Sequence, residues 1–325
     1  MRLLILAILL AAGGWSAYWF VGARALEGAL RDAIERARGN GVEVEVASLD
    51  VTGFPNRFDT IIEEPRVRLD SGIGWSAPFL QVFALSYRPN QLIAAFPHEQ
   101  SLSGPLGSAE ITTDDARASM TLTPSANLAL DHANLVIEDL RIASEGLSLT
   151  AARVLAASRI PEGAEDGRVQ NIGVTLDDVT LPPTLAGQLG LEGMATLDGA
   201  TLDATVTLAE PIDRDTIEGE PVDIRQIDIS RLDIDWGDFG LNAAGSVVVG
   251  ADGALTGEVE ATLTNWQHAV DIAVAAGLIP RNRTEQVRQA LQFVAGDADR
   301  LELPLNFRDG RVYLGPIPLG EAPRL

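Results

Sequence analysis

The sequence of 325 residues contains no cysteine and no lysine, and it has only three histidines. Without cysteine there is no disulfide, no thiolate nucleophile and no sulfur-ligated zinc. The histidines, His98, His132 and His268, lie far apart and lack the spacing of zinc ligands. The sequence also lacks a nucleophile elbow and a phosphate-binding glycine loop. We therefore expect no metal and no cofactor, and we predict that the protein is not an enzyme.

Two alternatives that involve chemistry stay open. The acidic pairs Asp177–Asp178 and Asp233–Asp235 could recruit calcium, although aspartates on strands are usually only solvated. A hydrolase built from dispersed carboxylates is the other alternative, and it would need a cleft that brings two acids together.

Aromatic residues are absent between residues 97 and 235, whereas seven of the seventeen lie between Phe54 and Phe96. The long middle must therefore pack with Leu, Val, Ile and Ala alone. Such a surface is either a sheet face of aliphatic side chains able to hold an acyl chain, or a thin core of small residues between two layers.

The net charge of −22 is concentrated in the middle of the chain, since residues 101–280 hold 8 Arg against 29 acidic residues. An acidic body repels phosphates, which argues against a nucleic-acid partner, and it stands away from anionic lipid headgroups. A basic protein partner would suit the acidic region 101–264. The simpler interpretation is that these carboxylates keep a large sheet soluble.

One long hydrophobic run is present, with nineteen uncharged residues between Leu3 and Val21. As a helix it would measure about 29 Å, close to the hydrocarbon thickness of a bilayer. Residues 1–22 are therefore predicted to be a single transmembrane anchor. A cleavable signal peptide, with small residues at 11–14, is the alternative, but the aromatic residues up to Phe20 are typical of a membrane–water boundary.

The flanking charges alone would leave the large domain inside the cell, because Arg2 faces four arginines at residues 24–38. We nevertheless expect it outside, because the run opens the chain as an export signal does and long domains translocate largely regardless of such charges. The predicted location is the inner membrane, single-pass, with the large domain in the periplasm.

Residues 23–40 carry apolar side chains at helical spacing, and residues 39–41 (GNG) end the pattern. This amphipathic helix is either an interfacial or partner-binding helix or a stalk that packs on the domain. Residues 41–325 then form a β-rich extracytoplasmic domain. The predicted fold is mainly β (α+β), a long curved antiparallel sheet with a helical hairpin near the C-terminus.

Short alternating or apolar segments at regular intervals indicate the strands of a meandering sheet. They are residues 42–46, 79–87, 92–96, 118–122, 128–130, 135–142, 147–155, 169–181, 194–197, 200–208, 222–236, 241–249 and 255–263, with a turn at 88–91. The apolar parity of 222–236 slips near Gln226 and near Ser230, which predicts two bulges. Residues 266–296 read as a helical hairpin, with Thr284 as an N-cap, and residues 301–314 as a terminal β-hairpin.

Four local motifs follow one another in residues 53–97: GFPNRFD at 53–59, WSAP at 75–78, ALSYRPN at 84–90 and IAAFP at 93–97. With the anchor before them, they resemble the domain-of-unknown-function 2125 family of bacterial envelope proteins. The resemblance implies a location and a fold but no chemistry, because the family has no established activity. The overall arrangement is also similar to AsmA-like proteins, whose long sheet has an apolar inner face implicated in lipid handling.

Within these motifs, Arg57, Tyr87, Arg88 and Asn90 are the candidate contacts for a lipid headgroup or a partner. The structural alternative makes residues 53–59 a rigid corner where the stalk helix meets the sheet. Our leading hypothesis is a sheet that binds a lipid or another apolar ligand. The alternative is a non-catalytic scaffold that docks an envelope protein through its acidic middle.

Overall fold

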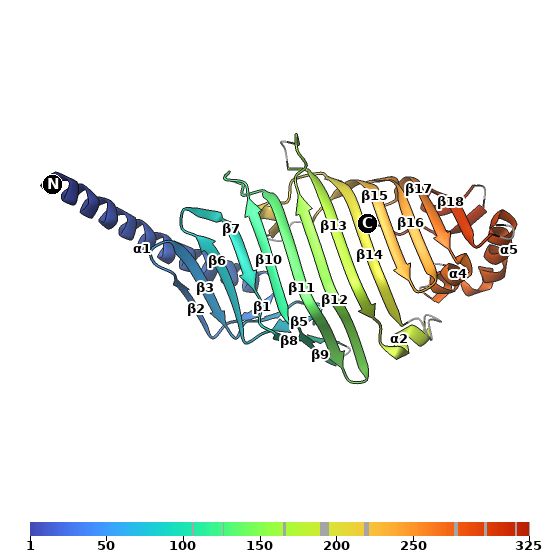
Figure 1. Cartoon of the computed structure of the whole chain (residues 1–325), viewed down its shortest axis with the longest axis horizontal. Helices are drawn as coiled ribbons and strands as arrows, with labels where there is room; N and C mark the ends of the chain where they lie inside the picture. Colours follow the sequence, from blue (N-terminus) through green and yellow to red (C-terminus); the bar gives the residue numbers. More distant parts are fainter. Residues whose placement is uncertain are drawn as a thin grey trace.

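The apolar run and the amphipathic segment form one continuous helix, α1 (Arg2–Gly39), in the computed structural model of the chain (Figure 1). We predicted an anchor and a separate stalk; the structure shows no break between them, because residues 2–39 contain no proline. The structure describes all residues except 106, 126, 165–166, 189–194, 218–220, 276–278, 296–297, 316 and 325. Residue 194, the first residue of the predicted strand 194–197, lies outside the described residues.

The described strands belong to one large sheet, and all their pairings are antiparallel, which confirms the predicted fold class. Nine consecutive strands form its main body. They are β10 (Asp115–Leu122), β11 (Leu130–Ser144), β12 (Leu147–Arg159), β13 (Val169–Thr180), β14 (Thr196–Leu208), β15 (Ile224–Trp236), β16 (Phe239–Val249), β17 (Leu255–Thr264) and β18 (Arg300–Arg308).

The sheet forks at β11, because β10 pairs with its first half and β9 with its second half. One limb continues from β10 through β7 (Arg88–Ala95), β6 (Phe79–Leu85), β3 (Arg57–Glu63) and β2 (Ser48–Thr52). The other limb consists of β9 (Gly107–Thr112), β8 (Glu99–Gly104), β5 (Gly74–Ser76), β4 (Arg66–Arg68) and β1 (Glu43–Glu45).

Most predicted strands are confirmed, with local corrections. The pairing of β15 with β14 shifts between Ile224 and Gln226 and again at Ser230, where two bulges were predicted. Residues 194–197 and 200–208 were predicted as two strands, but residues 196–208 run on through Gly199 as the single strand β14. The predicted turn at 88–91 is also wrong, because the turn falls at residues 86–87 and β7 starts at Arg88. Pro89 is tolerated there because pairing with β10 begins only at Gln91.

The C-terminal segments close one end of the sheet. They are α4 (Trp266–Ala275), the 3-10 turn η1 (Arg281–Arg283), α5 (Thr284–Ala295), β19 (Arg311–Leu314) and β20 (Ile317–Glu321). The predicted helical hairpin and terminal hairpin are present, and β20 was not predicted. Thr284 is not an N-cap, since it is the first residue of α5 and its hydroxyl donates to the Arg281 carbonyl oxygen. Two short helices, α2 (Pro183–Gln188) and α3 (Arg214–Ile217), occupy connections between strands.

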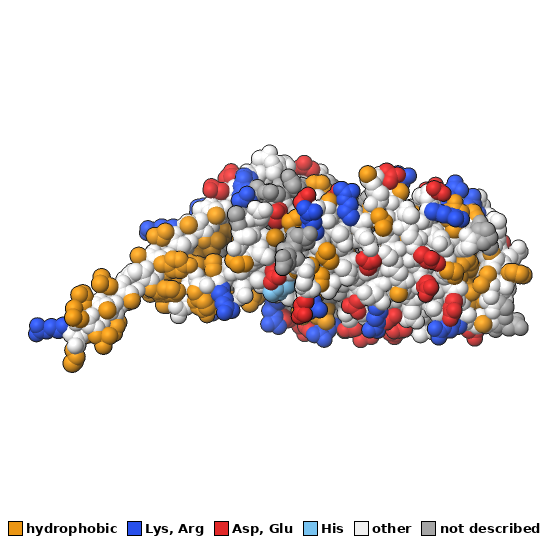
Figure 2. All heavy atoms as spheres, turned by 90° about the horizontal axis from the view of Figure 1, so that it is seen from above, with side chains coloured by type: hydrophobic (Ala, Val, Ile, Leu, Met, Phe, Trp, Pro, Cys, Tyr) orange, Lys and Arg blue, Asp and Glu red, His pale blue; other side chains and the backbone are white. Residues whose placement is uncertain are grey.

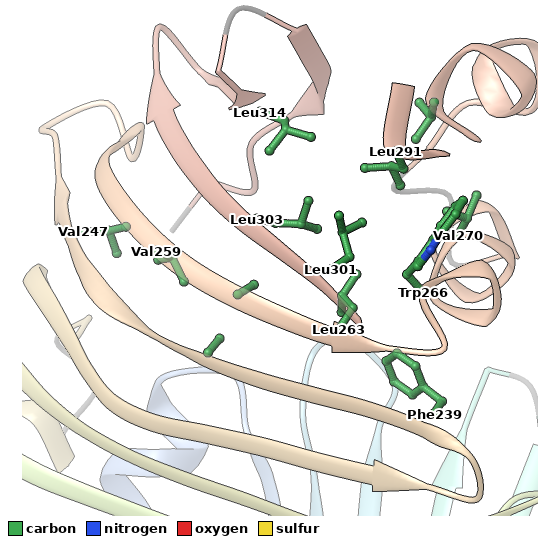
Figure 3. Packing of buried hydrophobic residues seen from close by; sticks show 13 residues of the cluster. Phe239, Val247, Val259, Leu263, Trp266, Val270, Leu291, Leu301, Leu303 and Leu314 are labelled. Atoms are coloured by element: carbon green, nitrogen blue, oxygen red, sulfur yellow. The ribbon is translucent and has the colours of Figure 1, made fainter. Parts of the chain in front are cut away.

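The largest hydrophobic core lies between these helices and the last strands (Figure 3). Leu263, Leu301 and Leu303 point from β17 and β18 toward the Trp266 indole and toward Leu291 of α5. Trp266 is only 2% exposed. Phe239 and Trp266, two of the aromatic residues that reappear from Trp236 onward, are both buried in this core.

Candidate functional site

A turn built from the 53–59 motif holds α1 against the sheet. The Arg57 backbone N–H donates to the Gly53 carbonyl oxygen (3.0 Å) and closes the turn, which includes a cis peptide bond between Phe54 and Pro55. Gly53 has a φ of +98°, and a Cβ there would lie 2.9 Å from the Arg57 carbonyl oxygen. Only glycine fits this position without strain.

Three aromatic side chains of α1 donate hydrogen bonds to backbone carbonyl oxygens of this turn and of the turn at residues 86–87. They are Trp15 Nε1 to Pro55 (2.9 Å), Tyr18 OH to Ser86 (2.6 Å) and Trp19 Nε1 to Arg57 (2.7 Å). The two turns are also joined to each other, because the Ser86 backbone N–H donates to the Asn56 carbonyl oxygen (2.9 Å). The helix and both turns therefore form one hydrogen-bonded unit.

A small aromatic core lies beneath these hydrogen bonds. Trp19 is 5% exposed and stacks on Phe58 at 6.0 Å between ring centroids, and the Phe54 ring meets its edge at 5.4 Å. Gly22 allows this approach, because a Cβ there would lie 2.9 Å from Phe58 Cζ. The packing agrees with the interpretation of residues 53–59 as a corner where the helix meets the sheet.

The structure brings three of the four candidate contact residues to the same end of the limb and separates the fourth. Arg57 pairs with Asp59 (2.9 Å) and lies over the Phe83 ring, while Tyr87 is 58% exposed in the neighbouring turn. Arg88 is exposed and pairs with Leu85 of β6. Leu85 also pairs with Arg57 of β3, so Arg57 and Arg88 lie on the two strands that flank β6.

Asn90 has a structural position instead. Its side-chain amide donates to the Leu122 carbonyl oxygen (2.8 Å), which fastens β7 to the end of β10. Asn90 is partly buried, in contrast to the exposed Tyr87 and Arg88 just before it.

The sequence analysis missed Trp15, Tyr18 and Trp19 as domain contacts. A signal was present, because these residues, together with Gly22 and Leu26, recur at spacings of three and four and therefore share one face of a helix. The apolar character of the whole run concealed that face, since a membrane span explains the same residues.

A second candidate surface is the apolar face of the sheet. Cross-strand neighbours place one row of aliphatic side chains on the same face from β11 to β18. The row is Leu135, Ala156, Val174, Leu202, Leu232, Ala243, Ala261 and Leu303. The next row lies on the opposite face and is polar: Thr175, Thr201, Asp233, Asn242 and Thr262. This alternation explains how a long stretch without aromatic residues specifies a sheet.

Helices pack extensively on the sheet only at its two ends, in the described part of the chain. α1 lies against β1 and β2, α4 against β16 and α5 against β18. Between them, Leu135, Ala156, Val174 and Leu202 belong to neither of the two hydrophobic clusters, and each keeps partial exposure. The described part of the loop after β14 contacts the start of β11, where the Leu130 backbone N–H donates to the Ile212 carbonyl oxygen (2.7 Å).

The predicted acidic pairs do not converge on a metal site. No group of three acidic or histidine side chains comes together among the described residues. Asp233 accepts a hydrogen bond from Asn242 (2.7 Å) and pairs with Arg231. These two hydrogen bonds, with Asn242 contributing most, hold the pKa of the Asp233 carboxyl below its usual range.

Replacing Asp233 with asparagine should therefore weaken the sheet in a pH-dependent way. A carboxyl with a lowered pKa stabilises the folded state above about pH 4, and this contribution is lost as the pH falls through the folded-state pKa. Denaturant unfolding should show a difference between wild type and D233N at pH 7 that shrinks below pH 4. D235N, on the same strand, is the control, and an equal pH-dependent change there would contradict the assignment.

α1 is long and apolar enough to cross a membrane, a test that a signal sequence would also pass.

No curated protein and no solved structure matches the chain, so the similarity to AsmA-like proteins stays an analogy of arrangement. The sequence model of a family described as uncharacterized protein conserved in bacteria (DUF2125) matches residues 19–323. The match extends far beyond the four motifs and includes α1 from Trp19 onward, both limbs and the apolar face. The chain therefore belongs to the DUF2125 family.

Proposed function

We propose that the protein is a single-pass inner-membrane protein whose periplasmic sheet binds a lipid acyl chain on its apolar face. The observation that carries the proposal is the row of aliphatic side chains between the two helix-covered ends, from Leu135 to Leu202. Neighbouring strands lie about 4.8 Å apart, so these four strands give an apolar track about 14 Å long. One leaflet of a bilayer has a hydrocarbon thickness of about 15 Å, which is a comparable length.

The energetics favour an acyl chain as the ligand. Each methylene group removed from water contributes about 0.8 kcal/mol to the binding free energy. An acyl chain that covers only part of the track therefore still gains several such contributions. The opposite face carries exposed carboxylates such as Glu258, Glu260 and Glu302, which repel anionic headgroups. A lipid is therefore expected on the aliphatic face only.

We propose a non-catalytic role, for which the support is the sequence itself, without a nucleophile elbow or zinc-ligand spacing. The periplasmic location is supported by α1, which is long and apolar enough to cross a membrane, and by the length of the domain after it, because long domains translocate largely regardless of flanking charges. A scaffold that binds a basic envelope protein is the second candidate, and the exposed carboxylates of β17 and β18 favour it.

The test compares two substitutions at adjacent positions of β13 that face opposite sides. V174E places a charge in the apolar track, whereas T175E places the same charge on the polar face. Native extraction followed by mass spectrometry should find lipid on the wild type and on T175E, and much less on V174E. Recovery of the wild type without lipid, under conditions that preserve lipid on a control protein, would remove the ligand part of the proposal. Thermal unfolding checks that both variants fold.

A further inference from the structure

The length of helix that is free of the domain is shorter than a bilayer. The apolar run is bounded by Arg2 and Arg24, and α1 is attached to the domain from Trp15 onward. Residues 3–14 measure only about 18 Å as a helix, against about 30 Å of hydrocarbon. The inference rests on the proposed anchoring of α1 in the membrane. If α1 spans the bilayer, the spanning segment must include the residues of α1 that contact the domain.

The attachment fixes how deep the two turns lie. Trp15 precedes Val21 by about 9 Å along the helix axis, and its indole is bonded to the Pro55 carbonyl oxygen. Each headgroup layer is only about 5–7 Å thick. If the bilayer covers the apolar run, the turns at residues 53–57 and 86–88, here called the tip, must reach the boundary between headgroups and hydrocarbon.

The side chains of the tip suit that boundary. Phe54 is 50% exposed and stacks on Phe20 of the helix, and Tyr87 is 58% exposed. Aromatic rings of this kind are favoured at the membrane–water interface, and the exposed Arg57 and Arg88 beside them match anionic headgroups. Figure 2 shows hydrophobic side chains along the free part of α1 and over the adjoining end of the body, where charged side chains are sparse in this view.

Three backbone carbonyl groups of the tip have hydrogen-bond partners, as a layer with little water requires. Carbonyl groups that enter a membrane must have hydrogen-bond partners, because an unpaired polar group there costs several kcal/mol. Pro55, Arg57 and Ser86 each have a carbonyl oxygen that accepts a hydrogen bond from an aromatic side chain of α1.

We propose that this tip inserts into the bilayer surface, so that the protein contacts lipid through its β-domain as well as through its helix. The partner is the headgroup layer of the membrane that α1 spans, with Phe54 and Tyr87 at the level of the upper acyl chains. The acidic part of the sheet then points away from the membrane.

The absence of cysteine allows a direct test on the full-length protein in vesicles of phosphatidylethanolamine and phosphatidylglycerol. Single variants L9C, F54C, Y87C and F293C each carry one environment-sensitive fluorophore. Quenching by nitroxide-labelled lipids reports contact with lipid, and quenching by iodide reports contact with water. F293C is the matched control, because Phe293 is an aromatic residue, 90% exposed, at the opposite end of the molecule (Figure 1).

Labels at residues 54 and 87 should be quenched by nitroxide lipids severalfold more than the label at residue 293. Residue 87 provides an independent reading, because Phe54 packs on the helix and its label could disturb the turn. Lipid quenching at residue 9 with iodide quenching at 54 and 87 would overturn the inference while leaving the anchor intact. Shielding of 54 and 87 from both quenchers would also overturn it, since it indicates a protein neighbour. Loss of lipid quenching at residue 9 would instead overturn the proposed anchoring.

Discussion

Replacing Trp19 with alanine should lower the free energy of unfolding by about 3–5 kcal/mol, the range for truncating a buried tryptophan. The variant loses the stack on Phe58, the edge contact with Phe54 and the hydrogen bond to the Arg57 carbonyl oxygen. That carbonyl oxygen would then need water. The helix should separate from the two turns before the rest of the sheet unfolds, because the remaining contacts of α1 are less buried.

The measurement is denaturant unfolding of the full-length protein in detergent, followed by circular dichroism and by proteolysis of the helix–sheet junction. V21A is the control, because Val21 lies on the same helix with 69% of its surface exposed and should change stability by no more than about 0.5 kcal/mol. Equal stability of W19A and V21A would show that α1 is not packed on the sheet as described.

Replacing Trp266 with alanine should destabilise the other end of the sheet by a similar amount, about 3–5 kcal/mol. The indole is 2% exposed and lies in the core formed by α4, α5 and the last strands (Figure 3). Its Nε1 has no hydrogen-bond partner among the described residues. W266F should therefore retain most of the stability, because it keeps an aromatic ring and removes a donor that is unpaired.

The control is F293A, since Phe293 is 90% exposed on α5 of the same helical hairpin. Thermal unfolding followed by circular dichroism should place F293A close to the wild type, W266F slightly lower and W266A far lower. A loss in W266F as large as that in W266A would mean that the indole N–H, and not the ring volume, stabilises this core.

The main body of the sheet was predictable because alternation and parity are local properties of a strand. The two parity slips in residues 222–236 even located the bulges of β15, since a bulge moves every following side chain to the other face. Residues 196–208 were wrongly predicted as two strands because Gly199, between two threonine-containing segments, resembles a turn residue. In the structure Gly199 stays in the strand and pairs with Asp235.

The fork and the docked helix could not be predicted from the same evidence. β4 and β5 have three residues each, too few to show a period, and this limb pairs β1 with β4 and β5 with β8, which are not neighbours in sequence. The candidate contacts were chosen from two motifs. Within the second motif, Asn90 is bonded to the end of β10, whereas Tyr87, three residues earlier, is exposed in the turn, and only the register of the strands reveals this difference.

The continuity of α1 has a mechanical consequence. A helix that crosses a bilayer adapts to its thickness by tilting, and the cost is a fraction of a kcal/mol per Å of mismatch. Since α1 passes from residue 2 to residue 39 without a hinge and is bonded to both turns, tilt cannot be absorbed at the membrane surface. If α1 spans the membrane as proposed, a thicker or thinner bilayer would rotate the entire sheet as a rigid body, and lipid composition would set the angle between the sheet and the membrane.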